Sequence, residues 1–298
     1  MKVFVTGGTG FIGTEVVKSL VSAGHEVRVL VRRNGAHGSS HLPDAAIRVD
    51  GDIFDTDIDK HLEGVDAVVN LVGIIREIKD WGITFQKLHV DSTKNIIRAM
   101  TSTGVKRLIQ LSALGSERGE SDYFRTKLEA EKAVKNSSLV WTIIKPSVVY
   151  GLGDGFVNML ASQVRTLPVV PVIGDGNYEL QPVHVKDVAT GVVKALSMVE
   201  TETKSYEVGG LQTFSYNRIL DEIARALGKI KALKVHFPLV IMRPSIAMLE
   251  RYSFFPITTD QLKMLLMSNT CDEKPYMTAF GIDPVKFRDG ISEYVKRK

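Results

Sequence analysis

Glycine residues stand directly between an apolar run and a segment with helical periodicity at the start of the chain. The run is Lys2–Thr6, and the loop that follows reads Gly7-Gly8-Thr9-Gly10-Phe11-Ile12-Gly13. A strand, a glycine-rich turn and a helix in this order form the context in which a dinucleotide-binding loop is found. A unit of this kind is typical of a parallel α/β sheet, so it constrains the fold more than any other segment.

Three glycines of this loop have separate expected tasks. Gly7 makes a tight turn, Gly10 lets the backbone approach a pyrophosphate, and Gly13 lets the helix pack closely on the strand. The helix N-terminus adds free N–H groups and the positive end of the helix dipole. The alternative is an ordinary strand-to-helix turn, whereas a Walker-type phosphate loop is excluded because no lysine precedes Thr14.

Strand-like and helix-like segments continue to alternate along the chain. Strands are expected at 27–31, 47–49, 67–71, 107–111 and 140–144, and helices at 10–23, 85–102 and 122–135. Alternation of this kind predicts a parallel sheet with crossover helices. The expected fold class is α/β, a doubly wound parallel Rossmann sheet of roughly six or seven strands with a smaller, mostly helical C-terminal lobe.

The alternation weakens after Pro146, where glycines and prolines divide the chain into short pieces. Residues 1–150 are expected to form the nucleotide-binding domain, and 151–182 together with 199–298 the smaller lobe for a substrate or partner. The stretch 183–198, with a helix starting near Asp187, is expected to return to the main sheet.

Composition excludes several classes of site. The net charge of +4 is scattered and only residues 296–298 form a basic run, so nucleic acid is not an expected partner. Cys271 is the only cysteine, which rules out an internal disulfide and a cysteine-based metal site, and no metal is expected. We expect a cytoplasmic location, because the first strand starts directly after Met1 and leaves no room for a signal sequence.

The spacing Gly-x-x-Gly-x-x-Gly resembles that of the short-chain dehydrogenase/reductase superfamily, in its extended and atypical branches. Segments at 146–151 (Pro-x-x-Val-Tyr-Gly) and 184–189 (His-Val-x-Asp-Val-Ala) resemble later motifs of extended members. The resemblance implies that a nicotinamide dinucleotide is contacted by these loop and strand-end residues: Gly7, Thr9, Gly10, Phe11, Ile12, Pro146 and Val149.

Two arginines, Arg32 and Arg33, follow the second expected strand. NAD-specific members of the superfamily usually have an acidic residue there, which accepts a hydrogen bond from the adenosine ribose. A guanidinium instead suits the 2′-phosphate of NADP by its charge and its planar set of donors. NADP(H) is therefore the preferred cofactor and NAD(H) a possible one, while the alternative for the arginines is a solvated charge at a strand end.

Two further segments are expected to line the same crevice. The resemblance implies that Asp52 accepts a hydrogen bond from the adenine amino group and that Ile53 covers the ring, although Asp52 could also be an ordinary turn former. Leu71, Val72 and Gly73 follow the fourth strand and resemble the segment beneath the cofactor ribose, with Gly73 leaving room for the dinucleotide.

Tyr123 and Lys127 match the superfamily's Tyr-x-x-x-Lys pair and are the expected catalytic residues. Positions i and i+4 share a helix face, so the Lys127 ammonium can favour a tyrosinate at Tyr123 and also bind the nicotinamide ribose. Ser112 is the expected third member, as a hydrogen bonder to substrate or cofactor. The superfamily's usual hydroxyl, however, aligns two residues later with Leu114, a departure that bears on catalysis and not on cofactor binding.

The segments 255–265 and 280–282 resemble the atypical group related to the Rossmann-fold accessory subunit of respiratory complex I. In that group the mitochondrial subunit holds NADPH as a structural nucleotide, and prokaryotic relatives are described as epimerases, dehydratases or reductases. Two functions follow for this chain. One is an NADP(H)-dependent oxidoreductase, or an epimerase or dehydratase, acting on a carbonyl or alcohol; the other is a non-catalytic NADP(H)-binding scaffold or sensor that contacts a protein partner or respiratory complex.

The stretch 237–256 is more apolar than one exposed helix face requires. Charged residues and a proline interrupt it, so it lacks the ~20 apolar residues of a membrane span. It is either the core of the smaller lobe or a surface for a lipophilic small-molecule substrate, a membrane or a protein complex.

Overall fold

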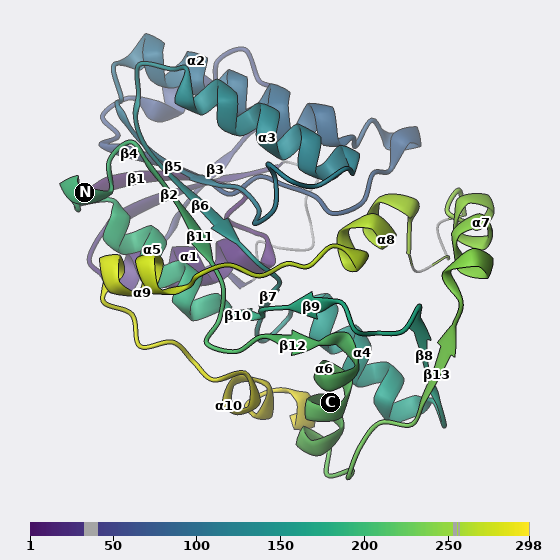
Figure 1. Ribbon diagram of the computed structural model, residues 1–298. Helices are drawn as coiled ribbons and strands as arrows, with labels where there is room; N and C mark the ends of the chain where they lie inside the picture. The colour runs from purple at the N-terminus through teal and green to yellow at the C-terminus, as the bar shows by residue number, and fades with distance from the viewer. Residues whose placement is uncertain (33–40, 253–254, 256, 298) are drawn as a thin grey trace.

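The structure, a computed structural model, describes residues 1–32, 41–252, 255 and 257–297. Within these residues the centre is a seven-stranded parallel sheet in the order β11-β6-β5-β4-β1-β2-β3 (Figure 1), which confirms the expected fold class. Its strands are β1 (Lys2–Thr6), β2 (Glu26–Val31), β3 (Ile47–Asp50), β4 (Ala67–Asn70), β5 (Arg107–Leu111), β6 (Val140–Pro146) and β11 (Lys204–Val208).

The central strand β1 is covered on both faces. Val3, Phe4 and Val5 are fully buried, as a parallel strand between two helical layers requires. Val5 lies in register with Val29 of β2 and with Val69 of β4. The carboxyl ends of these three strands therefore open onto the same edge of the sheet.

Helices cover both faces of the sheet (Figure 1). On one face lie α1 (Phe11–Ser22), α5 (Val185–Ala195) and α9 (Lys274–Phe280), which contribute to one apolar core. On the other lie α2 (Ser92–Thr103) and α3 (Asp122–Lys135), which contribute to a second core. Short helical turns precede α2, at Ile58–Leu62, Lys79–Trp81 and Gln86–Asp91.

The smaller lobe has a core of its own, built mainly by α4 (Phe156–Thr166), α6 (Tyr216–Ala226) and α10 (Phe287–Ser292). Three short strand pairs complete it: β7 (Val149–Tyr150) with β10 (Val183–His184), β8 (Val170–Ile173) with β13 (Lys234–Phe237), and β9 (Glu179–Leu180) with β12 (Phe214–Ser215). α8 (Thr259–Leu266) lies at its border with the sheet, and α7 (Leu239–Leu249) lies outermost (Figure 1).

The division between the lobes differs from the expected boundary after residue 198. β11 pairs with β6, and α9 packs into the core beneath α5, so both belong with the sheet rather than with the smaller lobe. β11 is a short edge strand that begins with an exposed lysine and serine, and such strands carry a weak apolar pattern. α5 itself lies against α1 in the main domain, whereas β10, at the start of the stretch 183–198, pairs with β7 in the smaller lobe.

Within the described residues, no helix combines the length and the apolar character needed to cross a lipid bilayer.

Candidate functional site

The glycine loop forms a turn in which side chains would collide with the backbone at two positions. Gly7 has φ +72°, and a Cβ on it would stand 2.8 Å from the carbonyl carbon of Leu71. A Cβ on Gly13 would stand 2.1 Å from the Gly7 oxygen. Gly10, at the N-cap of α1, faces open space, and a Cβ there would meet only the Gly7 oxygen, at 3.4 Å. An anion can therefore approach the backbone at Gly10 and the N-terminus of α1.

Buried polar side chains join three strand ends beside this loop. The Thr6 hydroxyl donates to Asn70 Oδ1 at 2.7 Å, and Asn70 Nδ2 donates to Gln110 Oε1 at 2.9 Å. The Leu71 N–H donates to the Thr6 carbonyl at 3.0 Å. Because these side chains are buried and hydrogen-bonded to one another, they hold the segment 71–73 rigidly alongside the glycine turn.

The other expected cofactor contacts lie on the same edge of the sheet. Pro146 ends β6 and Val149 begins β7. The Phe11 ring lies 3.5 Å from the position of a Cβ on Gly151, which places the segment 146–151 beside the first turn of α1. Residues 9, 11 and 12 of the loop are partly exposed there.

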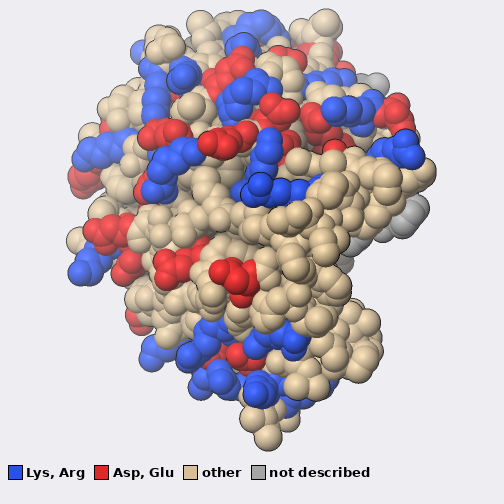
Figure 2. Space-filling model, turned by 45° about the vertical axis from the view of Figure 1, so that its right-hand side comes forward, with Lys and Arg blue, Asp and Glu red and all other residues tan. Residues whose placement is uncertain are grey.

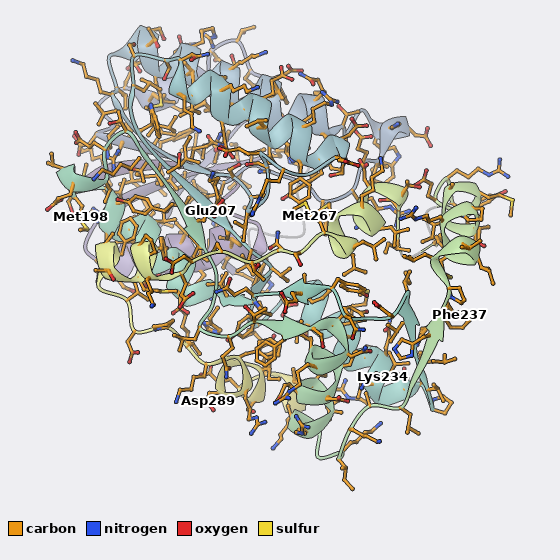
Figure 3. The ribbon with its side chains drawn as sticks, viewed as in Figure 1. Met198, Glu207, Lys234, Phe237, Met267 and Asp289 are labelled. Carbon is orange, nitrogen blue, oxygen red and sulfur yellow. The ribbon has the colours of Figure 1, made fainter. Side chains whose placement is uncertain are left out.

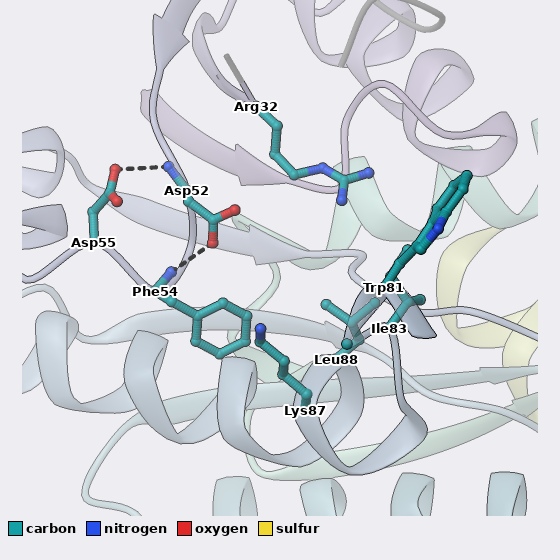
Figure 4. A pocket seen from close by; sticks show the side chains of 9 residues that line it. Arg32, Asp52, Phe54, Asp55, Trp81, Ile83, Lys87 and Leu88 are labelled. Carbon is teal, nitrogen blue, oxygen red and sulfur yellow. Dashed lines mark hydrogen bonds between the residues drawn. The ribbon is translucent and has the colours of Figure 1, made fainter. Parts of the chain in front are cut away.

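A hollow of about 380 Å³ lies beyond the carboxyl ends of β2 and β3 (Figure 4). It is lined by Arg32, Asp52, Phe54, Trp81 and Lys87, together with Asp55, Gly82, Ile83 and Leu88. The sequence predicts the adenosine end of a cofactor at this position, since it follows the second and third strands. The hollow thus offers one flat indole, one phenyl ring and two cations.

Some of the residues that the sequence predicts at the adenosine end line the hollow, and others do not. The Ile53 side chain is buried in the core with Phe4 and Leu30, and its neighbour Phe54 lines the hollow. Arg32 lies where the sequence predicts it, while Arg33 lies outside the described residues.

Lys87 and Trp81 are lining residues that sequence reasoning did not single out. Lys87 Nζ lies 5.2 Å from the centre of the Phe54 ring. Both residues come from the chain between β4 and α2, about fifty residues after Arg32, and a lysine on a helix surface is too common to indicate a site. Lys87 and Trp81 lie near the end of β2 only because the chain folds, since they are distant from it in sequence.

Tyr123 and Lys127 lie one turn apart on α3, whose N-cap Ser121 accepts a hydrogen bond from the Phe124 N–H at 3.3 Å. Both side chains are buried. The Lys127 amine reaches the segment after β4, because a Cβ on Gly73 would stand 2.9 Å from Nζ. The structure therefore brings Lys127 and Gly73, which are distant in sequence, together at the crevice.

Burial controls the charge of this pair. It raises the pKa of Tyr123 to about 12. It also lowers the pKa of Lys127 to about 8, a shift that the carboxylate of Glu131 opposes. At neutral pH Tyr123 is a neutral proton donor and Lys127 is mostly a cation. Negative charge that develops on the phenolic oxygen would be stabilised by this ammonium.

His89 is a buried neighbour of Tyr123 that sequence reasoning missed. It lies in the π-helical turn Gln86–Asp91 that leads into α2. Its Nδ1 is 2.9 Å from Thr126 Oγ1, its Nε2 is 3.2 Å from the Ile74 nitrogen, and its ring meets Tyr123 edge-on at 5.4 Å. Burial lowers the pKa of His89 to about 2, so its imidazole is neutral. In the sequence it is one histidine on an apolar helix face, which indicates packing more than function.

Ser112 is engaged by a buried carboxylate. Its hydroxyl donates to Glu131 Oε1 at 2.5 Å, and Ser116 donates to the same oxygen at 2.7 Å. Leu114, where the superfamily's hydroxyl aligns, is fully buried and its N–H donates to the Pro146 carbonyl at 2.9 Å. The hydroxyl that the sequence offers for substrate is thus used inside the protein in this structure.

Several apolar side chains also pack around Tyr123. The buried group around it consists of Phe85, Ala113 and Phe124, and Ile74, Met264 and Met267 pack against this group. The two methionines come from the segment at and just after α8 (Figure 3), and Met267 Cε would lie 2.4 Å from a Cβ on Gly115. Residues at and just after α8 therefore contribute to the apolar surroundings of Tyr123.

The sequence of the chain matches the model of a known protein family. The model of the NAD dependent epimerase/dehydratase family matches residues 3–209, which include the glycine loop, the Tyr123–Lys127 pair and the segment 146–151. The chain belongs to this family. Membership in this NAD(P)-binding family confirms the resemblance predicted from the sequence.

Relatives within the family have diverse names. The chain is 31% identical to the mitochondrial NADH dehydrogenase (ubiquinone) 1 alpha subcomplex subunit 9 of Arabidopsis thaliana over 230 residues, 73% of this chain and 56% of that protein. It is 28% identical to a ceramide reductase of Caulobacter vibrioides over 192 residues, 64% of this chain and 59% of that protein. The match thus spans little more than half the length of either relative.

The chain is also similar to solved structures over its whole length. UDP-glucuronic acid 4-epimerase from Bacillus cereus, in complex with UDP-glucuronic acid and NAD, has a TM-score of 0.78 to this chain at 21% identity. The similarity covers 100% of this chain and 99% of that one. At this identity the likeness shows the common fold alone.

Proposed function

We propose that the protein is an NADP(H)-dependent oxidoreductase that reduces a carbonyl group, or oxidises the corresponding alcohol, on a lipophilic small molecule. The observation that carries the proposal is the buried pair of Tyr123 and Lys127. The Lys127 amine lies against Gly73, and apolar side chains pack around the Tyr123 ring. The name of one relative, ceramide reductase, supports both the reductive reaction and the lipophilic substrate.

The crevice suits NADP(H) at three points. The open backbone at Gly10 and the N-terminus of α1 would hold the pyrophosphate. Lys127 would bind the nicotinamide ribose, next to Gly73. Arg32 and Lys87 present two cations to the hollow at the adenosine end, where the 2′-phosphate would lie.

The two acidic residues of the hollow are hydrogen-bonded within their own turn. Asp55 Oδ2 accepts a hydrogen bond from the Asp52 N–H at 2.8 Å, and Asp52 Oδ1 accepts one from the Phe54 N–H at 3.0 Å. Both carboxylates therefore bind backbone donors of their own turn. The two cations of the hollow, Arg32 and Lys87, support NADP(H) over NAD(H) as the preferred cofactor.

The reaction follows from the protonation states of the pair. Bound NADPH would supply a hydride to the carbonyl carbon. Tyr123, kept protonated by burial, would donate its phenolic proton to the carbonyl oxygen, and the Lys127 ammonium would stabilise the resulting tyrosinate. In the oxidising direction the tyrosinate would accept the proton of the alcohol.

His89 and Phe85 would position Tyr123 without adding charge. Both rings meet Tyr123 edge-on, with ring centres 5.4 and 5.8 Å away. Because the imidazole is neutral, Lys127 and not His89 would supply the positive charge for a tyrosinate.

A screen of NADPH consumption tests this function. The purified protein is offered long-chain ketones and aldehydes in one set and nucleotide sugars in another, with NADH in place of NADPH as the cofactor control. We expect NADPH oxidation with lipophilic carbonyls and little with nucleotide sugars. Turnover of a nucleotide sugar alone would contradict the lipophilic substrate.

A non-catalytic NADP(H)-binding scaffold is the second candidate. The engagement of Ser112 by Glu131 favours it, because the expected substrate-orienting hydroxyl is then occupied. The name of the Arabidopsis relative, a subunit of NADH dehydrogenase, supports contact with a protein complex. The oxidoreductase and the scaffold can be distinguished by measuring turnover. Tight binding of NADPH without any carbonyl reduction would favour the scaffold.

A further inference from the structure

The helix α7 is an apolar helix with an exposed surface. Its sequence, LVIMRPSIAML, contains one charged residue, yet only Ile246 is fully buried. Val240 is 85% exposed, Ile241 59% and Met248 63%. A helix on the surface of a globular domain normally turns its apolar side chains toward the core, so these three side chains need another explanation.

Exposed apolar residues continue from α7 into the segment before it. Leu233, Val235 and Phe237, in and next to β13, are exposed, and Phe237 marks the junction between β13 and α7 (Figure 3). We call Leu233, Val235, Phe237, Val240, Ile241 and Met248 the α7 surface. Figure 2, in which the side of α7 comes forward, shows a wide area of uncharged side chains there. Exposed apolar side chains that gather in one part of a surface mark interaction sites.

The C-terminal end of α7 is fixed to the main domain. Arg76, after β4, donates to the Phe255 carbonyl at 2.7 Å and to the Tyr252 carbonyl at 3.3 Å. On the other side, Glu250 Oε2 accepts a hydrogen bond from the Thr259 N–H at 2.6 Å. These contacts hold α7 in a defined position while its apolar surface stays outward.

The segment that carries the α7 surface is predominantly basic. Residues 227–252 include one acidic residue, Glu250, which accepts the hydrogen bond from Thr259. Their basic residues are Lys229, Lys231, Lys234, Arg243 and Arg251. Lys234 pairs with Asp221, and Lys229 donates to the Val164 carbonyl. The side chains of Lys231, Arg243 and Arg251 are exposed.

We propose that the α7 surface rests on an anionic lipid bilayer. Apolar side chains of an interfacial helix enter the boundary between headgroups and acyl chains, and neighbouring lysines and arginines bind the lipid phosphates. α7 has 11 residues, a length of roughly 16 Å, which allows it to lie in the interface and not to span the bilayer.

Charge complementarity favours an anionic bilayer over a second copy of the chain as the occupant of the α7 surface. In a two-fold dimer built on the α7 surface, the basic residues of both copies would face each other and repel. The phosphates of anionic lipids instead match the exposed basic side chains of this segment. The proposal is independent of turnover, since it concerns a surface outside the cofactor crevice.

Vesicle flotation of the full-length protein tests the proposal. The vesicles contain phosphatidylcholine alone or equal parts of phosphatidylcholine and phosphatidylglycerol. The test variant is Val240→Glu with Ile241→Glu, and the matched control is Val199→Glu, at a site that is 72% exposed and outside the α7 surface. We expect the wild type and V199E to float with the anionic vesicles, and the double variant to bind at least roughly tenfold more weakly.

Two measurements keep the result interpretable. Circular dichroism and thermal unfolding must show that the double variant folds, which we expect because both positions are exposed. Light scattering reports the oligomeric state without lipid. The proposal is overturned if the wild type does not float with anionic vesicles or if the folded double variant floats equally well. It is also overturned if the wild type forms a dimer that the double variant does not form.

Discussion

The Lys127 amine lies directly against the backbone of Gly73, so close that a Cβ on Gly73 would stand 2.9 Å from Nζ. Gly73→Ala should therefore displace the amine from the crevice. Since Nζ is the end of a flexible side chain, we expect the free energy of unfolding to change by less than about 1 kcal/mol, while carbonyl reduction falls roughly tenfold or more. Urea unfolding and NADPH oxidation measure the two effects.

The control for this variant is Gly155→Ala, because a Cβ on Gly155 meets nothing within 4 Å. It should change neither stability nor turnover. Full activity of Gly73→Ala would show that the position of Lys127 does not matter for the reaction.

Two glycines of the N-terminal loop should respond differently to alanine. In Gly13→Ala the new Cβ would lie 2.1 Å from the Gly7 oxygen, a backbone atom that cannot move freely, so the free energy of unfolding should fall by at least about 2 kcal/mol. In Gly10→Ala the Cβ enters open space, so stability should be nearly unchanged while NADPH binds more weakly. Thermal unfolding and calorimetric titration separate the two outcomes, and a Gly10→Ala variant that binds NADPH normally would remove that glycine from the cofactor site.

Arg32 and Lys87 should both contribute to the preference for NADPH. A charge-assisted hydrogen bond to the 2′-phosphate is worth about 1.5–3 kcal/mol, so Arg32→Ala and Lys87→Ala should each weaken NADPH binding about tenfold or more and leave NADH binding unchanged. Lys18→Ala, an exposed position on α1, is the control for a change of net charge. Equal losses for NADPH and NADH would mean that neither cation contacts the 2′-phosphate.

The part of the fold that could be predicted follows from burial on both faces of the sheet. Strands such as β1 and β4 are continuous apolar runs because helices cover them on both sides, and the glycines at 7 and 13 are required by the backbone itself. β11 could not be predicted in the same way. It pairs on one side only, and exposed polar residues occupy its first positions.

The site could be predicted where residues are local in sequence and could not where the fold assembles them. Tyr123 and Lys127 share a helix face, so their spacing alone indicates a pair. Lys87 reaches the hollow beside Arg32 only through the packing of the β4–α2 connection. Ser112 could not be assigned either, because its bond to Glu131 depends on how α3 lies against β5.

His89 should make stability depend on pH. Its pKa is lowered by burial to about 2 in the folded protein and is about 6.5 when unfolded. Below pH 6.5 the unfolded state therefore binds more protons at His89 than the folded state does. The free energy of unfolding should be highest above pH 6.5 and should fall by about 1.4 kcal/mol per pH unit as the pH is lowered toward 2. Urea unfolding of the wild type and His89→Gln at pH 7 and pH 5 isolates the effect. An equal loss of stability in the two proteins would show that folding does not shift the pKa of His89.

The central claim is that Tyr123 transfers the proton in a carbonyl reduction, and Tyr123→Phe tests it most directly because the ring and its packing remain. NADPH oxidation with a long-chain ketone and calorimetric NADPH binding are measured on the same preparations, with Tyr206→Phe on β11 as the control. The account predicts a loss of turnover of roughly 10²-fold or more with NADPH affinity nearly unchanged. Undiminished turnover by the folded Tyr123→Phe variant would contradict it.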